Sequence, residues 1–140
     1  MTQLSKMLPA CGFVIAVALI GITSAFKDAP KNGNGREMYV FEYNPPESDP
    51  EPYSVANVQD VSHWTSTTDA TPCTNTNFKA CKIYASAGNV DASGSEPVLL
   101  SSEAISATLN TTTNSAYVSS TDDGSLSNPS TSENISNRNN

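Results

Sequence analysis

The fold predicted for this chain is decided by the stretch FKACKIYAS at residues 78–86. Its apolar, aromatic and β-branched side chains favour an extended strand, which Gly88 and Asn89 then end. Successive side chains of a strand point to opposite faces, so Cys81 and Ile83 are expected on one face. The stretch therefore predicts a strand that carries a cysteine beside a core residue.

A second strand is predicted at residues 38–43, whose sequence MYVFEY is again rich in β-branched and aromatic residues. Alternation places Tyr39, Phe41 and Tyr43 on one face of this strand and the other three residues on the opposite face. The sequence Asn-Pro-Pro at residues 44–46 ends the strand, because proline has no N–H to donate.

Between these strands, residues 53–64 carry an apolar side chain at every third position: Val55, Val58, Val61 and Trp64. This spacing predicts a short helix or 3₁₀-rich turn, capped by Ser54, that gathers the four side chains on one side. Valine is a weak helix former, so irregular structure pinned by Trp64 is the alternative. In either case Trp64 is expected to anchor the core.

The rest of the chain is mostly polar. Residues 66–77 are predicted to form a loop, and a short helix is predicted after Ser101 or Ser102, with Glu103 in its first turn. This helix would turn three side chains toward the core: Ala104, Ile105 and Leu109. Residues 116–127 have the form of a hairpin about the Asp-Asp-Gly sequence at 122–124.

Together these segments predict one small β-rich domain, with an α+β arrangement as a variant, over residues 38–127. A flexible tether at residues 26–37 precedes it, and a disordered tail at residues 128–140 follows it, because both are too polar to bury much surface. The expected core is Tyr39, Phe41, Val58, Trp64, Ile83, Tyr84, Leu99, Ile105, Leu109 and Tyr117.

Residues 1–25 have the features of a cleavable signal peptide. A short start with Lys6 as its only charge leads into the apolar run at residues 8–22, and small residues end it. We expect cleavage between Ala25 and Phe26. An uncleaved membrane anchor is one alternative, but the run is short for a bilayer span. Lipidation at Cys11 is another, although that cysteine precedes the apolar run.

Cleavage changes the cysteine count, because Cys11 leaves with the leader. The remaining pair, Cys73 and Cys81, is expected to form a disulfide in an exported protein. Closing so short a loop is worth roughly 2.6 kcal/mol in the chain-entropy model. A metal site or a redox pair are the rival interpretations, but His63 is the only histidine and redox cysteines are usually separated by two residues.

The charge of the chain narrows the classes of partner. The formal net charge is −7, which argues against nucleic acid and against anionic membrane lipids. The alternating acids Glu47, Asp49 and Glu51 begin like a calcium loop, but Pro52 stands where such a loop needs glycine. No cofactor, no metal and no membrane contact after leader cleavage are therefore predicted.

Catalytic chemistry is not indicated either. Nucleophilic catalysis needs a base beside the nucleophile, and His63 is the only side chain whose ordinary pKa suits that work. The sequence contains no nucleophile elbow, phosphate loop or zinc-protease motif. We expect that the protein is not an enzyme and that His63 is a surface or half-buried residue.

Four stretches resemble short exported proteins of Bacteroidota that have a signal peptide and a small two-cysteine domain of unknown function. They are LPACGFVIA at residues 8–16, NVQDVSHW at 57–64, the pair Cys73 and ACKI at 80–83, and ISNR at 135–138. The resemblance implies a single exported module of a Gram-negative cell, secreted or held in the periplasm or envelope. It implies no activity and no catalytic or binding residues.

Two functions of different classes follow from these observations. The first is a non-catalytic structural or binding module whose partner is a protein or a glycan, as size and acidity indicate. The second is a secreted peptide effector or signal precursor, as the short chain and cleavable leader indicate.

Overall fold

The computed structural model describes residues 38–139, apart from residue 75 and residues 126–133. The predicted leader, its cleavage site between Ala25 and Phe26, and the tether lie outside the described residues. The described elements are β1 (Met38–Tyr43), α2 (Val55–Gln59), η1 (Val61–His63), β2 (Trp64–Thr67), β3 (Lys79–Ser86), η2 (Ala87–Asn89), β4 (Val90–Asp91), β5 (Val98–Leu99), β6 (Ser106–Asn110), β7 (Ser115–Thr121), β8 (Gly124–Ser125) and β9 (Ile135–Arg138). The prediction of a small β-rich domain with few helices is confirmed.

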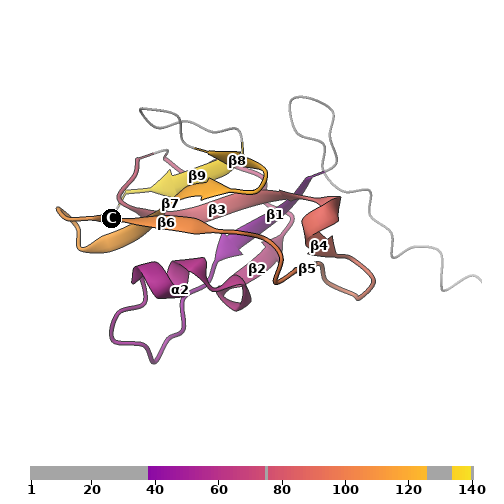
Figure 1. The fold of residues 1–140 in the computed structure, drawn as a ribbon, viewed down its shortest axis with the longest axis horizontal. Coiled ribbons are helices and arrows are strands. Elements are labelled where there is room, and N and C mark those ends of the chain that lie inside the picture. Colours follow the sequence, from indigo (N-terminus) through magenta and orange to yellow (C-terminus); the bar gives the residue numbers. More distant parts are fainter. Residues whose placement is uncertain (1–37, 75, 126–133, 140) are drawn as a thin grey trace, which may run out of the picture.

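The largest sheet has four strands in the order β2-β1-β3-β9, and every neighbouring pair is antiparallel (Figure 1). Its centre is formed by the two strands that the sequence predicts most directly, β1 and β3. Their register places Phe41 opposite Ile83, and both side chains are 0% exposed. The predicted strand at residues 38–43 coincides with β1, and the one at 78–86 differs from β3 by a single residue at its start.

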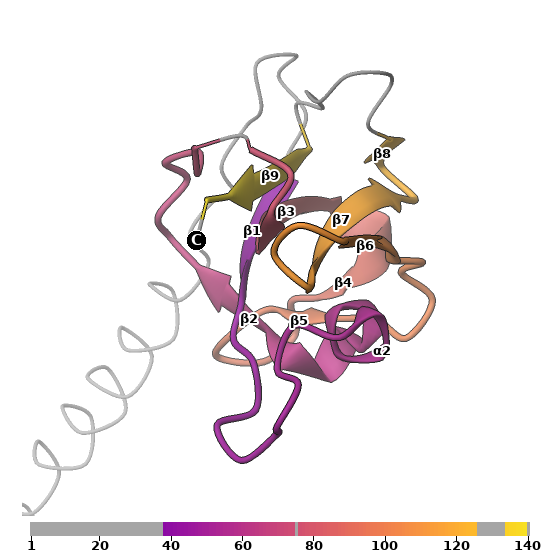
Figure 2. The same ribbon diagram turned by 90° about the vertical axis from the view of Figure 1, so that its left-hand side faces the viewer.

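A three-stranded sheet, β6-β7-β8, packs against the first sheet, and α2 lies below β6 and β7 in the view of Figure 1. Ala116 and Val118 of β7 are fully buried in the core that the two sheets share. The short pair β4-β5 lies at the right-hand end of these layers in Figure 1, and Figure 2 views the fold from the opposite end. The core therefore forms from segments far apart in the sequence.

The region between the prolines and β2 folds as its apolar spacing predicts. The Ser54 side chain caps α2 by accepting a bond from the Asn57 N–H at 3.2 Å. Val58 is fully buried, and the Trp64 indole N–H donates to the Val58 carbonyl at 2.9 Å. Trp64 also stacks at a tilt on Tyr43, with ring centroids 5.1 Å apart. Its predicted role as a core anchor is confirmed.

The helix predicted after Ser101 or Ser102 is wrong. Residues 101–102 form a turn, and Ser106–Asn110 form strand β6, which pairs with β7 from Asn110 opposite Ser115. Hydrogen bonding to a neighbouring strand outweighs the weak local preference for a helix. The predicted hairpin at residues 116–127 is present as β7 and β8, with its turn at Asp122 and Asp123.

Four members of the expected core are not fully buried: Leu109, Tyr39, Tyr84 and Tyr117. Leu109 is 44% exposed, because it stands near the end of β6, and Tyr84 and Tyr117 are half-buried. Tyr39 is partly buried and packs against the core. The other expected members are buried: Phe41, Val58, Trp64, Ile83, Leu99 and Ile105.

Two polar segments contain strands that the sequence interpretation missed. Residues 64–67 form β2 at one edge of the four-stranded sheet, so Ser66 and Thr67, the first two residues of the predicted loop at 66–77, lie in a strand. The predicted disorder of residues 128–140 does not hold at Ile135–Arg138, which form β9 at the other edge. Ile135 is 3% exposed and Asn137 is 2% exposed. Pairing with β3 gives these polar residues the backbone partners that they lack in isolation.

The expectation that Cys81 and Ile83 share a face is also wrong. The register between β3 and β9 shifts between Ala80 and Lys82, so Cys81 is the extra residue of a bulge. A bulge breaks the alternation of faces, and Ala80 and Ile83 both join the core while Cys81 does not.

Candidate functional site

The first candidate region is the face of the four-stranded sheet that points away from the core. Residues 69–74, which we call the strap, cross this face. The Cys73–Cys81 disulfide joins the strap to β3, with the two Cα atoms 6.5 Å apart. The Cys73 N–H donates to the Ser136 hydroxyl at 2.7 Å, and the Tyr84 hydroxyl donates to the Ala70 carbonyl at 3.0 Å. The predicted disulfide is thus present and ties a loop onto the sheet.

A buried lysine holds the other end of the strap. The Lys82 ammonium is 2.7 Å from the Asp69 carboxylate and also donates to the carbonyls of Asp69 and Thr71, at 3.0 and 3.1 Å. Lys82 is only 4% exposed. The hydrogen bond from Lys82, followed by bonds from Thr71, holds the pKa of the Asp69 carboxyl well below its usual range. Nothing in the sequence pattern indicates this partner, because Asp69 lies in a polar segment 13 residues before Lys82.

The second candidate region is an open groove of about 380 Å³ at the end of the β6–β7 hairpin. One wall is the segment Pro50–Val55, and the other is formed by Leu109, Asn114 and Ser115. Asn114 has a left-handed backbone, with φ at 51°, which suits the turn between the strands. The lining combines the carbon surface of Pro50, Pro52 and Leu109 with polar groups of residues such as Glu51 and Asn114, so the groove suits an extended ligand that has both apolar and polar groups.

Cationic side chains border this groove. The Lys79 ammonium lies 5.0 Å from the centre of the Tyr53 ring, and the Arg138 guanidinium carbon lies 5.9 Å from it. Arg138 also donates to the Tyr53 hydroxyl. Because these cations are engaged with Tyr53, they fix the wall of the groove and help to fasten β9 to it.

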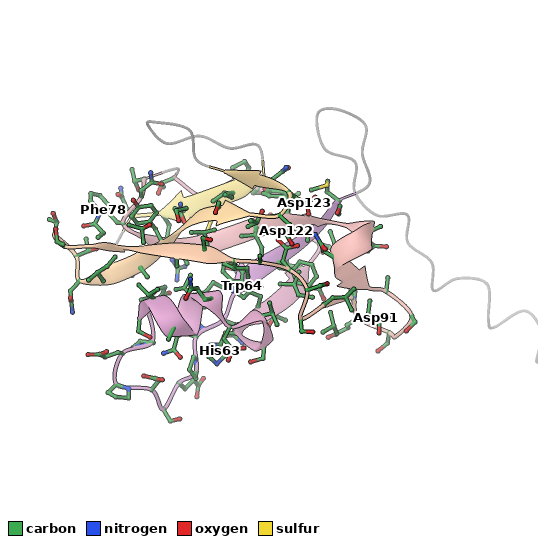
Figure 3. All side chains as sticks on the ribbon, in the orientation of Figure 1. His63, Trp64, Phe78, Asp91, Asp122 and Asp123 are labelled. Carbon is green, nitrogen blue, oxygen red and sulfur yellow. A yellow bond between two sulfur atoms is a disulfide. The ribbon has the colours of Figure 1, made fainter. Side chains whose placement is uncertain are left out.

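A buried carboxyl group forms the third candidate region, at the end of the sheets opposite Phe78, where Figure 3 shows Asp122 and Asp123. Glu103 is 4% exposed, and one of its carboxyl oxygens accepts from the Asp122 N–H at 3.3 Å. Its other oxygen, Oε2, is buried without a hydrogen-bond partner in the described part of the chain. Burial, together with the charges of Asp123 and Asp122, raises the pKa of Glu103 to about 7.

These acids serve the fold. The Asp123 carboxylate accepts from the Ser86 N–H at 2.8 Å, and the Asp122 carboxylate accepts from the Ala104 N–H at 3.1 Å. They therefore hold the β7–β8 turn against the end of β3 and the start of β6. In residues 38–139, outside the gaps named above, no three His, Cys, Asp or Glu side chains are grouped to hold a metal.

His63 and Asp49, the middle one of the alternating acids, also have structural partners. The His63 ring nitrogen Nδ1 is 2.9 Å from the Asn57 carbonyl, and the ring is half-buried next to α2. The Asp49 carboxylate accepts from the Glu51 N–H at 2.8 Å and from the Asn57 amide at 2.9 Å, so it orders the proline loop. His63, at the bottom of Figure 3, lies far from Asp122 and Asp123 in the fold.

Among the residues singled out from the sequence, Cys73 and Cys81 are bonded to each other, and His63 and Asp49 both contact Asn57. The sequence pattern does not predict the groove, because Leu109 is expected in the core and Pro52 is interpreted only as a departure from a calcium loop. The sequence does carry one sign of the groove: a proline-rich segment directly before a capped helix, which is typical of a rigid surface loop.

In the described ranges, no helix combines the length and hydropathy that a bilayer crossing requires. No protein-family model matches the chain, and no curated protein or solved structure is detectably similar to it.

Proposed function

We propose that the protein is a small exported module, secreted or kept in the periplasm or envelope, that works by binding and not by catalysis. The observation that carries this proposal is how the chain uses its reactive groups. Lys82, His63 and the Asp122–Asp123 pair are all engaged in contacts within the fold. The groove at Leu109, in contrast, is open, and its lining is more apolar than polar.

Two further observations support an exported module. A disulfide between Cys73 and Cys81 suits an oxidising compartment. A shared core of two sheets, closed by a strand from the C-terminal end, suits a protein that acts as an intact domain. A peptide effector would need to be cut free of such a domain, so the form of the exported chain separates the two functions.

The test is to express the full-length chain in a Gram-negative host and to measure the mass of the polypeptide in the periplasm and the medium. We expect an intact chain that begins at Phe26 and carries no free thiols. A shorter fragment as the main product would favour the peptide effector. The matched control is Ala25→Tyr, which places a bulky residue at the cleavage position and should leave the leader attached.

A further inference from the structure

The β6–β7–β8 sheet has one closed edge. Ala116 of β7 donates its N–H to the Tyr53 carbonyl at 2.7 Å. The Asn137 side chain accepts from the Val118 N–H at 3.0 Å and donates to the Val118 carbonyl at 2.9 Å, in the manner of a neighbouring strand. Farther along, β7 pairs with β8. The Ala116 N–H and both backbone groups of Val118 therefore have partners on this side of β7.

The other edge of the sheet, along β6, is open. Ala107 and Leu109 stand opposite Val118 and Ala116, whose backbone groups point away from β6. In an antiparallel ladder, facing residues both point inward or both point outward. The N–H and C=O groups of Ala107 and Leu109 therefore point out of the sheet, and no described residue bonds to them.

The side chains on this edge leave it accessible and unguarded. Ser106, Thr108 and Leu109 are exposed. Natural edge strands are commonly protected from pairing by charged residues or proline. Residues 104–121, which include all of β6 and β7, contain no Asp, Glu, Lys, Arg or Pro, although the chain as a whole has a net charge of −7. A second copy of this chain can thus approach at this edge without local charge repulsion.

We infer that β6 pairs antiparallel with β6 of a second copy, about a two-fold axis at Thr108. This inference rests on the proposal that the protein works by binding, and it names the partner. The register places Ala107 opposite Leu109 of the second copy, and Leu109 opposite Ala107 of the second copy. Both pairs consist of outward-pointing residues, so each exchanges two backbone bonds, about four in all.

The same register buries part of the apolar surface at the groove. Leu109, which is 44% exposed, packs beside Ala107 of the second copy, and the two Thr108 side chains face each other across the axis. One short strand buries little area, so the dimer should be weak and should dissociate on dilution.

The test places a charged side chain at position 108, where the two copies meet on the two-fold axis. The mature chain, residues 26–140, is compared with Thr108→Lys and Thr108→Glu by analytical ultracentrifugation over a range of concentrations. The wild type should show a concentration-dependent dimer, and each variant alone should be monomeric, because like charges face each other. An equimolar mixture of the two variants should recover the dimer, because opposite charges then meet.

Val98→Lys is the matched control, because Val98 is 60% exposed on β5 and away from β6, and it should dimerise like the wild type. Ala107→Pro is a second test variant. It removes an outward N–H without breaking the β6–β7 ladder, and it too should be monomeric.

A monomeric wild type, or dimers of Thr108→Lys alone, would overturn the inference. A mixture that fails to recover the dimer would mean that a different surface or a different partner strand is used. Neither result would alter the mass of the exported chain, which tests the proposed function separately.

Discussion

Among the described carboxylic acids, Glu103 is one whose ionisation opposes folding. It lies buried beside two aspartates, and one of its carboxyl oxygens has no hydrogen-bond partner in the described part of the chain. Its pKa of about 7 in the folded protein exceeds the ordinary value of 4.5. The folded state therefore binds the proton more tightly than the unfolded state does. This stabilisation is complete below about pH 4.5 and is lost as the pH rises through about 7.

Glu103→Gln should remove this dependence, because the amide stays neutral and its oxygen can still accept from the Asp122 N–H. We expect the variant to be more stable than the wild type at pH 8, by roughly 1 to 3 kcal/mol, and the difference to shrink toward pH 5. Urea unfolding at several pH values measures it. Glu96→Gln, at an exposed position, is the control. Parallel pH curves for wild type and Glu103→Gln would contradict the prediction.

Asn137 is the second residue whose role is set by burial. Its amide replaces a strand next to Val118 and also donates to the Asn77 side chain at 3.0 Å. Asn137→Leu would leave the N–H and C=O of Val118 buried without partners. We expect a loss of about 2 to 4 kcal/mol in the free energy of unfolding. Asn139→Ala, at an exposed position, should change it by less than about 0.5 kcal/mol.

At the scale of elements, the strap shows how a disulfide and a buried charge act on one loop. Cys81 anchors the strap at a bulge of β3, and Lys82 anchors it one residue later. The bulge matters because it turns Cys81 out of the core and toward Cys73. Both anchors attach the strap, which has no secondary structure of its own, to the sheet. The stabilisation that each anchor provides should therefore depend on the presence of the other.

A double-mutant cycle tests this dependence. Replacing Cys73 and Cys81 by serine should cost about 2 to 4 kcal/mol, and Lys82→Met alone about 1 to 3 kcal/mol, because Lys82 loses its partners in the strap. Together they should cost less than their sum, since a strap that has lost the disulfide is already partly detached. Lys79→Met is the control for removing a lysine from β3. Strict additivity would mean that the two anchors act separately.

At the scale of the whole molecule, β9 closes the fold from the C-terminal end. It pairs with β3 in one sheet, and its Asn137 bonds to β7 in the other. Its Arg138 reaches Tyr53 near α2. Strand β9, which lies in a segment predicted from its polar sequence to be disordered, thus contacts both sheets and the wall of the groove.

Removing residues 134–140 should therefore abolish cooperative unfolding, because β3 loses a partner and the core loses Ile135. Far-ultraviolet circular dichroism and thermal melting of the shortened mature chain measure the effect. Removing only residues 139–140 is the control, and it should leave the melting transition nearly unchanged, since Asn139 is exposed. A truncation at residue 133 that melts like the intact chain would show that β9 adds nothing to stability.

The sequence by itself determined β1, β3, the capped turn at Ser54, the burial of Trp64, the hairpin at Asp122–Asp123 and the disulfide. In each case a local pattern of side chains carries the information, or, for the disulfide, the presence of only two cysteines outside the predicted leader. Tertiary structure alone decided that Ser106–Asn110 is a strand, that Ile135–Arg138 is a buried strand, and that Cys81 lies in a bulge. The physical reason is that the two strands form through backbone hydrogen bonds to strands distant in the sequence, and the bulge at Cys81 arises where β3 pairs with β9. Those bonds do not depend on side-chain type, so the sequence pattern does not reveal them.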